Sequence, residues 1–272
     1  MRPKKSLGQN FLRDQRTVSK IVALLDLSEE DSVIEIGCGT GILTRHLAGQ
    51  VRRFVGVELD SELAHKLSVE FALPGVSILN QDVLDLDFSG LGETRGREIR
   101  WKIVGNLPYY ITSPILRHLG RHSNSVERAV VMVQAEVAER LRAQPATKAY
   151  GLLTLLVQWS FEVESPFRVP SRCFWPVPKV DSAVVPLKPK PDRPLDPGAT
   201  DAFFKFLSQS FSQRRKTLRN CLRGTVASID LETILREEGW PTAVRAEALS
   251  LDDFVRLFRR LHPPAGEVRN KR

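Results

Sequence analysis

The residues of this sequence whose types and order are best suited to chemistry are Asn106, Leu107, Pro108 and Tyr109. The Asn106 side-chain oxygen and the carbonyl of Leu107 or Pro108 offer acceptors to both N–H bonds of an exocyclic amine such as adenine N6. Acceptors so arranged favour a pyramidal nitrogen whose lone pair attacks an electrophilic methyl group in line. Proline fixes the turn and removes one N–H donor, and the Tyr109 ring provides a stacking surface for an unstacked base. The alternative is an ordinary Asn-Pro turn with a core tyrosine.

A glycine-rich segment forms a second candidate site, because Gly37, Gly39 and Gly41 directly follow the apolar run at 32–36. Glycine lets the backbone approach a ligand closely. The spacing GxGxG differs from the GxGxxG of dinucleotide binding, and a sulfonium nucleoside has no pyrophosphate to place at a helix N-terminus. The segment therefore favours S-adenosylmethionine over a nicotinamide cofactor, with a dehydrogenase as the remote alternative.

Two carboxylates follow the next two apolar runs of the chain. Glu58 closes FVGVE and is expected to accept from both ribose hydroxyls of the cofactor, while Asp82 follows VSILNQ and is expected to accept from its adenine amine. Ligands of open α/β sheets bind at the carboxyl ends of the strands, where both acids are expected. One such acid alone would be an ordinary surface residue, but two in succession after GxGxG indicate one cofactor pocket.

The sequence shows no pattern typical of a metal site or a covalent nucleophile. The five histidines are scattered, and Cys38, Cys173 and Cys221 are far apart without CxxC spacing, so we expect no metal and reduced thiols. No window reaches the roughly 18 apolar residues of a membrane span, and the N-terminus lacks a secretory signal. We expect a cytoplasmic protein without a membrane partner.

A sheet must bring these residues together, and the periodicity predicts one. Short apolar runs alternate with amphipathic helical patterns, which is typical of a parallel α/β sheet. The runs are at 32–36, 54–59, 76–79, 101–104 and 129–133.

The C-terminal third of the chain changes character. Segment 166–191 holds seven prolines, which excludes a helix and predicts a rigid loop with an edge strand around SAVVPL. The stretch 188–198 is typical of a linker, and the pattern beyond it is helical to about residue 262. We therefore expect an α/β domain at 1–190 and a small all-helical domain at 191–272.

The net charge of +8 is unevenly distributed and favours an anionic partner. Residues 1–20, 205–223 and 256–272 each carry six lysines and arginines with at most one acid. Arg215, Arg219 and Arg223 recur every four residues and would form one stripe on a helix, although a solvated basic surface is the alternative. The cations that we expect to bind RNA are Arg214, Arg215, Lys216, Arg219 and Arg223.

Five motifs, in order, give nearly the whole chain a resemblance to the ribosomal RNA adenine dimethyltransferases. They are LGQNFL at 7–12, EIGCGTG at 35–41, NLPYYIT at 106–112, FWPVPKVDSAVV at 174–185 and FSQRRKTLRN at 211–220. The resemblance implies a Rossmann-like sheet of the S-adenosylmethionine-dependent methyltransferases, followed by a small all-helical RNA-binding domain.

The resemblance also implies roles for single positions. Phe174 matches an aromatic residue that sandwiches the target base opposite Tyr109. Cys38 and Tyr110 depart from the family, in which proline and asparagine are common there, and Tyr110 leaves the shape of the base pocket open. The residues that match cofactor-binding positions of the family are Asn10, Leu12, Gly37, Glu58, Asp82 and Asn106.

The implied reaction dimethylates N6 of two adjacent adenosines in the 3′-terminal hairpin loop of small-subunit rRNA and releases S-adenosylhomocysteine. The implied partner is rRNA, within a 30S particle or its precursor, bound by a monomer acting in ribosome biogenesis. A loop substrate agrees with the way RNA is read, at unstacked single-stranded bases. Two alternatives are an enzyme of the macrolide-resistance type, which methylates an adenosine of large-subunit rRNA, and a non-catalytic assembly factor.

Overall fold

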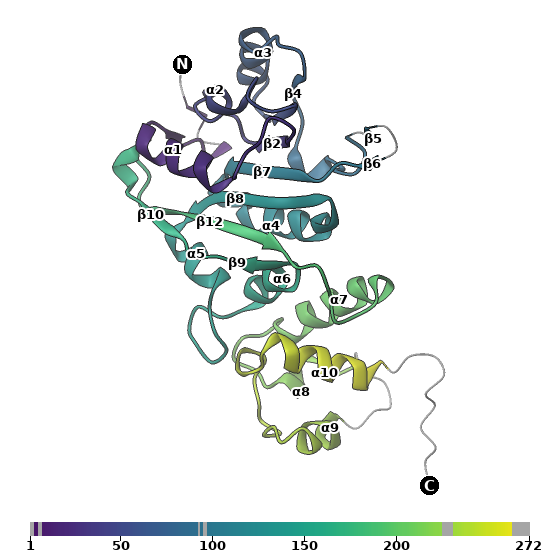
Figure 1. Ribbon diagram of the computed structural model, residues 1–272. Helices are drawn as coiled ribbons and strands as arrows, with labels where there is room; N and C mark the ends of the chain where they lie inside the picture. The colour runs from purple at the N-terminus through teal and green to yellow at the C-terminus, as the bar shows by residue number, and fades with distance from the viewer. Residues whose placement is uncertain (1–2, 5–6, 92, 95–96, 225–230, 263–272) are drawn as a thin grey trace. The chain divides into compact units, whose positions relative to one another are not determined.

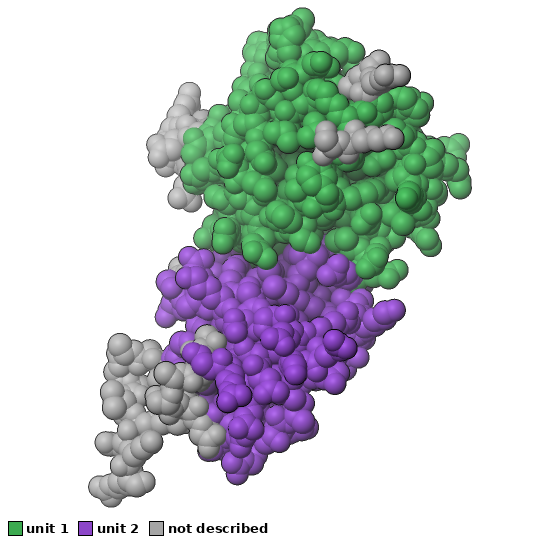
Figure 2. All heavy atoms as spheres, turned by 180° about the vertical axis from the view of Figure 1, so that it is seen from behind, with its two compact units in different colours: residues 1–139, 160–190 green, residues 140–159, 191–272 purple. Residues whose placement is uncertain are grey.

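The chain forms two compact units in the computed structural model (Figure 2). The first unit comprises residues 1–139 and 160–190, and the second comprises residues 140–159 and 191–272. The residues that the structure describes are 3–4, 7–91, 93–94, 97–224 and 231–262.

The first unit is built on an eight-stranded sheet in the order β10-β12-β8-β7-β2-β3-β4, with β9 also paired to β12 (Figure 1). The strands β4, β3, β2, β7 and β8 are parallel, which confirms the predicted α/β sheet. Their bounds are β2 Ser32–Ile36, β3 Arg53–Val57, β4 Val76–Leu79, β7 Trp101–Asn106 and β8 Val126–Gln134. The antiparallel strands are β9 Phe161–Val163, β10 Phe167–Val169 and β12 Ser182–Pro189.

Helices connect most of the parallel strands, while residues 80–100 between β4 and β7 contain a 3-10 turn and a small strand pair. The helices are α1 Gln15–Leu24, α2 Thr44–Leu47, α3 Ser61–Glu70, α4 Thr112–Arg121 and α5 Ala135–Leu141. Two small strand pairs lie outside the sheet, β1 Phe11–Leu12 with β11 Phe174–Trp175, and β5 Glu93–Thr94 with β6 Arg97–Glu98. Asp14 begins α1 by accepting a hydrogen bond from Thr17 N at 2.8 Å, which satisfies a free donor of the first turn.

The strand order places the candidate residues at a topological switch point. From β2 the chain adds β3 and β4 on one side and then returns to add β7 and β8 on the other. The register pairs Ile36 with Gly105, so the residues following β2 lie beside the end of β7. Open α/β sheets bind ligands outside the carboxyl ends at such a point.

Strand β12 corrects one prediction, because it is not an edge strand. It pairs with β8 on one side, and with β10 and β9 on the other. Pro186 is tolerated there because its carbonyl accepts from Glu164 N at 3.0 Å, which shows that its nitrogen also faces the β9–β10 side. The partner strands on that side are interrupted between Val163 and Phe167, so the missing N–H breaks no ladder bond.

The second unit contains more of the chain than predicted, because residues 140–159 belong to it. Helix α6, Leu152–Ser160, places Leu155, Leu156 and Trp159 in one core cluster with Phe203 and Phe254. The other helices of this unit are α7 Thr200–Ser210, α8 Leu218–Cys221, α9 Leu231–Glu237 and α10 Leu251–Leu261. Across the described ranges, no helix has the length and apolar character that a bilayer span needs.

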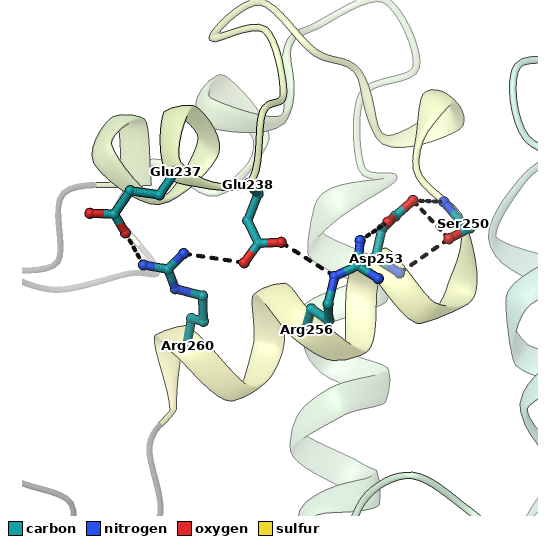
Figure 3. A network of polar contacts seen from close by, with 6 residues as sticks. All are labelled: Glu237, Glu238, Ser250, Asp253, Arg256 and Arg260. Carbon is teal, nitrogen blue, oxygen red and sulfur yellow. Dashed lines mark hydrogen bonds and ion pairs between the residues drawn. The ribbon is translucent and has the colours of Figure 1, made fainter.

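Ion pairs join the end of α9 to α10 (Figure 3). Glu238 lies between two arginines of α10, with 3.3 Å to Arg256 Nε and 3.2 Å to Arg260 Nη1. Arg260 also pairs with Glu237, and Arg256 with Asp253. Two cations of the basic segment 256–272 are therefore neutralised within this unit, and the cations at positions 269, 271 and 272 lie outside the described residues.

Candidate active site

An open pocket lies at the carboxyl ends of β2, β3 and β7. The predicted residues that line it are Asn10, Gly37, Gly39, Glu58, Asp82, Asn106, Leu107, Pro108 and Tyr109. The structure thus brings together the glycine loop, both acids and the NLPY motif.

The glycine loop is tied to the first acid. Gly39 has φ +57°, and a Cβ there would lie 3.1 Å from the Phe11 ring, so only glycine fits this turn without strain. Its N–H donates to Glu58 Oε2 at 2.8 Å, while Asp60 N donates to Glu58 Oε1 at 2.9 Å. Burial raises the pKa of Glu58, and these two donors oppose that shift by favouring the ionised form. The carboxylate is therefore oriented by the backbone beside the pocket.

Asp82 is half-buried in the pocket wall. Its Oδ1 accepts from Leu84 N at 2.9 Å and caps a short 3-10 turn at Val83–Asp85. This hydrogen bond fixes the side chain and leaves the other carboxylate oxygen for a further donor.

Asn106 is the last residue of β7, and its amide is oriented by the N-terminal arm, of which the structure describes residues 3–4 and 7–10. Asn106 Nδ2 donates to the backbone carbonyl of Asn10 at 2.8 Å. Because the amide nitrogen is committed to the arm, Oδ1 is the atom left to accept from a substrate. This is the orientation that the predicted chemistry requires.

The arm itself is anchored by a buried acid that the sequence analysis did not single out. Asp60 is 3% exposed and accepts from Lys4 Nζ at 2.8 Å and from Gln9 Nε2 at 2.9 Å. Burial opposes ionisation, but the bonds from Lys4 and Gln9 prevail and lower the pKa of Asp60. Asp60 also caps α3 by accepting a hydrogen bond from Glu62 N. An aspartate before a helical pattern is a recognisable capping signal, and it could have drawn attention to Asp60 in the sequence.

The two carbonyls of the NLPY motif differ. Pro108 O already accepts from Ile111 N at 3.2 Å and from Thr112 Oγ1 at 3.0 Å. Leu107 N donates to Met132 O at 3.0 Å, which fixes the turn against β8. Leu107 therefore presents the carbonyl better placed to accept from a substrate.

The two tyrosines that follow have different settings. Tyr109 is half-buried, and its hydroxyl shares a hydrogen bond of 2.6 Å with Ser182 Oγ. Burial raises the pKa of the Tyr109 phenol, although the hydrogen bond with Ser182 acts to lower it. Tyr110 is 54% exposed and lies against the arm, since a Cβ on Gly8 would be 3.1 Å from its ring. The Tyr110 departure from the family therefore adds an aromatic ring at the pocket mouth.

Three predicted residues do not line the pocket. Leu12 and Phe174 are 3% and 2% exposed and pack in the core of the first unit, where β1 pairs with β11. Gly41 closes the turn behind the pocket, donating to Cys38 O at 2.9 Å. The expectation that the Phe174 ring faces Tyr109 across the base is not met, because the β1–β11 pairing buries it. Trp175, its neighbour, is the exposed ring.

The pocket wall also contains residues that sequence reasoning missed. Phe11 stands beside Gly39, and Gln81 precedes Asp82. Both lie next to predicted residues, but neither a single phenylalanine nor a single glutamine belongs to a spacing that indicates a binding site.

The predicted arginine stripe is wrong, because residues 211–217 form a turn between α7 and α8. Thr217 has an extended backbone and caps α8, accepting from Asn220 N at 3.3 Å, so Arg215 and Arg219 do not share a helix. Arg214 Nε lies 3.4 Å from Glu247, and Arg219 Nη1 lies 2.5 Å from Glu232.

All five predicted cations are exposed. Arg215, Lys216 and Arg223 form no ion pair with any residue in the described ranges. Of the five predicted cations, these three are therefore not engaged in an ion pair with a described residue.

No group of three or more potential metal ligands comes together in the described part of the chain. The three cysteines are free, with Cys38 and Cys221 buried. Burial raises the pKa of the Cys38 thiol well above its ordinary value. Cys38, the other departure from the family, therefore serves as a packing residue behind the pocket.

Comparison with known proteins gives consistent results. The family described as Ribosomal RNA adenine dimethylase matches residues 1–262. A protein of Chromobacterium violaceum named Ribosomal RNA small subunit methyltransferase A is 41% identical over 260 residues, covering 96% of each chain. Two solved structures resemble this one over 92% of the chain. The first is a dimethyladenosine transferase of Plasmodium falciparum, with a TM-score of 0.75, 25% sequence identity and 98% of its chain covered. The second is the 23S rRNA methyltransferase ErmE, with a TM-score of 0.67, 28% sequence identity and 99% of its chain covered. The chain belongs to the ribosomal RNA adenine dimethylase family.

Proposed function

We propose that the protein dimethylates N6 of two adjacent adenosines in the 3′-terminal hairpin loop of small-subunit rRNA, with S-adenosylmethionine as the methyl donor. The observation that carries the proposal is the orientation of Asn106, whose nitrogen is tied to Asn10 O so that Oδ1 is free for a substrate amine. The family relationship and the small-subunit enzyme from Chromobacterium violaceum support the substrate.

The pocket residues fit S-adenosylmethionine. Glu58 is an oriented carboxylate suited to a pair of ribose hydroxyls. Asp82 keeps one carboxylate oxygen for an adenine amine. Gly37 and Gly39 have no side chain, so the cofactor can approach the backbone closely there. A charge-assisted hydrogen bond of this kind contributes about 1.5–3 kcal/mol. S-adenosylmethionine held by these residues would supply an electrophilic methyl group.

The chain's own residues would then activate and hold the target base. Asn106 Oδ1 and the Leu107 carbonyl accept the two N–H bonds of N6, which concentrates the lone pair on the nitrogen. Tyr109 stacks on the base, and its bond to Ser182 fixes the ring. Acceptors placed where positive charge develops on N6 stabilise the transition state more than the ground state.

The test is methylation of purified 30S and 50S particles and of their rRNAs, followed by mass-spectrometric nucleoside mapping. We expect N6,N6-dimethyladenosine at two adjacent positions of small-subunit rRNA. Methylation of large-subunit rRNA alone would assign the chain to the macrolide-resistance type. S-adenosylmethionine binding without transfer to either RNA would instead support the non-catalytic assembly factor. As an independent test, nucleoside mapping compares the rRNA of cells with and without the gene.

A further inference from the structure

A row of exposed cations and rings lies beside the pocket, on a part of the first unit that the proposed chemistry does not use. Arg13 follows β1, and its guanidinium carbon lies 4.8 Å from the centroid of the Trp175 ring, which is 37% exposed. Arg16 and Lys20 follow on α1 and are exposed, and Lys20 Nζ lies 5.5 Å from the centroid of the Phe167 ring. We name Arg13, Arg16, Lys20 and Trp175 the α1 surface.

Backbone pairing holds this surface against the pocket. Phe11 pairs with Trp175 across β1 and β11, and Arg13 N donates to Cys173 O at 2.8 Å. The Phe11 and Trp175 rings are stacked, with centroids 6.4 Å apart and an angle of 24° between their planes. Because Phe11 also lines the pocket, the α1 surface begins at the pocket wall.

The cations of the α1 surface are not neutralised. Within the described residues, no carboxylate forms an ion pair with Arg13, Arg16 or Lys20. Of the acids nearby, Asp14 is engaged in capping α1, where Thr17 N and Oγ1 donate to it at 2.8 and 2.6 Å. Asp181, on the proline-rich segment, pairs with Arg168 at 2.9 Å. The surface therefore keeps a net positive charge, in contrast to Arg214 and Arg219 of the second unit.

Unpaired cations interleaved with an exposed aromatic ring match one kind of ligand. Proteins that bind single-stranded nucleic acid combine cations that follow the phosphates with rings on which bases stack. An acidic peptide would use the cations but has no base to stack on Trp175. The position at the pocket wall suits nucleotides next to a base that has been turned into the pocket.

We propose that the α1 surface binds the single-stranded nucleotides flanking the target adenosine, with one base stacked on Trp175 and phosphates on Arg13, Arg16 and Lys20. The proposal rests on the proposed function and adds to it the subsite that holds the neighbouring nucleotides. A base that stacks on Trp175 displaces the Arg13 guanidinium. Arg13 remains held beside the ring by its bond to Cys173 O, within reach of that nucleotide's phosphate.

The test measures binding directly, with a hairpin RNA carrying the 3′-terminal loop of small-subunit rRNA and a blunt duplex of the same stem. Trp175→Ala should weaken hairpin binding by about 5-fold or more, from a stacking contribution of roughly 1–3 kcal/mol per base, and leave duplex binding unchanged. Trp175→Phe should restore most of the affinity. The matched control is Trp240→Ala in the second unit, where Arg256 lies 5.8 Å from the ring centroid, and it should change hairpin affinity less than twofold.

A triple variant, Arg13→Gln, Arg16→Gln and Lys20→Gln, tests the phosphate contacts and keeps the Trp175 side chain, although it removes the Arg13 guanidinium that lies over that ring. It should reduce the salt slope of log affinity for the hairpin by about 2, at roughly 0.7 per contact. Unchanged melting temperature and S-adenosylmethionine affinity show that each variant is folded. If the folded triple variant and Trp175→Ala both bind the hairpin as the wild type does, the proposal is overturned. Failure of the proposed function would appear instead as absence of methylation by the wild type.

Discussion

At the scale of single residues, Asn106 has two separable tasks in the proposed mechanism. Its nitrogen holds the arm, and its oxygen is proposed to accept from the substrate amine. Asn106→Ala should lower kcat by about 100-fold or more, the usual effect of losing one group that stabilises transition-state charge. S-adenosylmethionine affinity should fall by no more than about tenfold, since one neutral hydrogen bond contributes roughly 0.5–1.5 kcal/mol. Single-turnover kinetics and calorimetry measure the two effects, and a near-normal single-turnover rate would remove Asn106 from the mechanism.

Tyr109 is expected to act through its ring, with the hydroxyl serving to hold that ring. Tyr109→Ala should abolish activity, whereas Tyr109→Phe should keep most of it, because stacking contributes roughly 1–3 kcal/mol per base. Tyr109→Phe should also be slightly less stable, since it leaves the buried Ser182 hydroxyl without its partner. Ser182→Ala in the Tyr109→Phe background is the matched control and should add little further loss. If Tyr109→Phe loses as much activity as Tyr109→Ala, the hydroxyl rather than the ring is required for activity.

At the scale of elements, the N-terminal arm is joined to the start of α3 by Asp60. The double variant Lys4→Met, Gln9→Leu removes both donors to this buried acid and should release the arm. We expect faster dissociation of S-adenosylmethionine and faster proteolysis within residues 7–10, with the hairpin salt slope nearly unchanged. Lys4→Arg, which keeps the charge, is the control, and equal dissociation rates in all three proteins would contradict the anchoring role.

Strand β2 contains a buried acid, Glu35, which is 1% exposed and accepts from Thr44 Oγ1 at 2.7 Å. Burial raises its pKa from the ordinary 4.5 to about 8. Between these values the native state binds more protons than the unfolded chain. The stability from this group is therefore fully present below pH 4.5 and is lost as the pH rises through 8.

Glu35→Gln keeps the acceptor for Thr44 and removes the titration. Between pH 6 and pH 8 the wild type should lose about 2 kcal/mol of unfolding free energy relative to Glu35→Gln, at about 1.4 kcal/mol per unit. Urea unfolding at both pH values measures this difference. If it does not change with pH, Glu35 is not protonated in the folded protein.

At the scale of the whole molecule, the five cations predicted to bind RNA are not equally free to do so. Arg214 and Arg219 are neutralised within the second unit by Glu247 and Glu232, while Arg215, Lys216 and Arg223 have no such partner among the described residues. Lys4 pairs with Asp60, and Arg2 and Lys5 of the N-terminal segment lie outside the described residues. Among the five predicted cations, RNA contacts are therefore expected mainly at Arg215, Lys216 and Arg223.

The triple variant Arg215→Gln, Lys216→Gln, Arg223→Gln should reduce the salt slope of RNA affinity by about 2–3, for all RNA sequences alike. The matched variant Arg214→Gln, Arg219→Gln should reduce it by less than 1, because those cations are already paired. A salt series with calorimetric control of S-adenosylmethionine affinity measures both. Equal slopes for the two variants would show that the ion pairs open on binding RNA.

The amino-acid sequence by itself determined the sheet and the position of its ligand pocket. Apolar runs of four to six residues define the parallel strands, and the residues just after them, Gly37, Glu58, Asp82 and Asn106, must meet where the carboxyl ends of those strands converge. The prediction succeeds because the pattern that defines a strand is local in the sequence. Ligands of parallel sheets bind at the carboxyl ends of the strands, so a residue's place just after a strand also gives its place in the fold.

Only the tertiary structure decided which residues contact one another across long sequence separations. It placed Phe174 in the core, moved α6 into the second unit, paired Arg219 with Glu232 and turned the Asn106 amide toward Asn10. These outcomes depend on the paths of turns and loops, where a cap such as Thr217 interrupts the periodicity. Burial and ion pairing are properties of the assembled chain, so no spacing along the sequence encodes which cation stays free or which ring stays exposed.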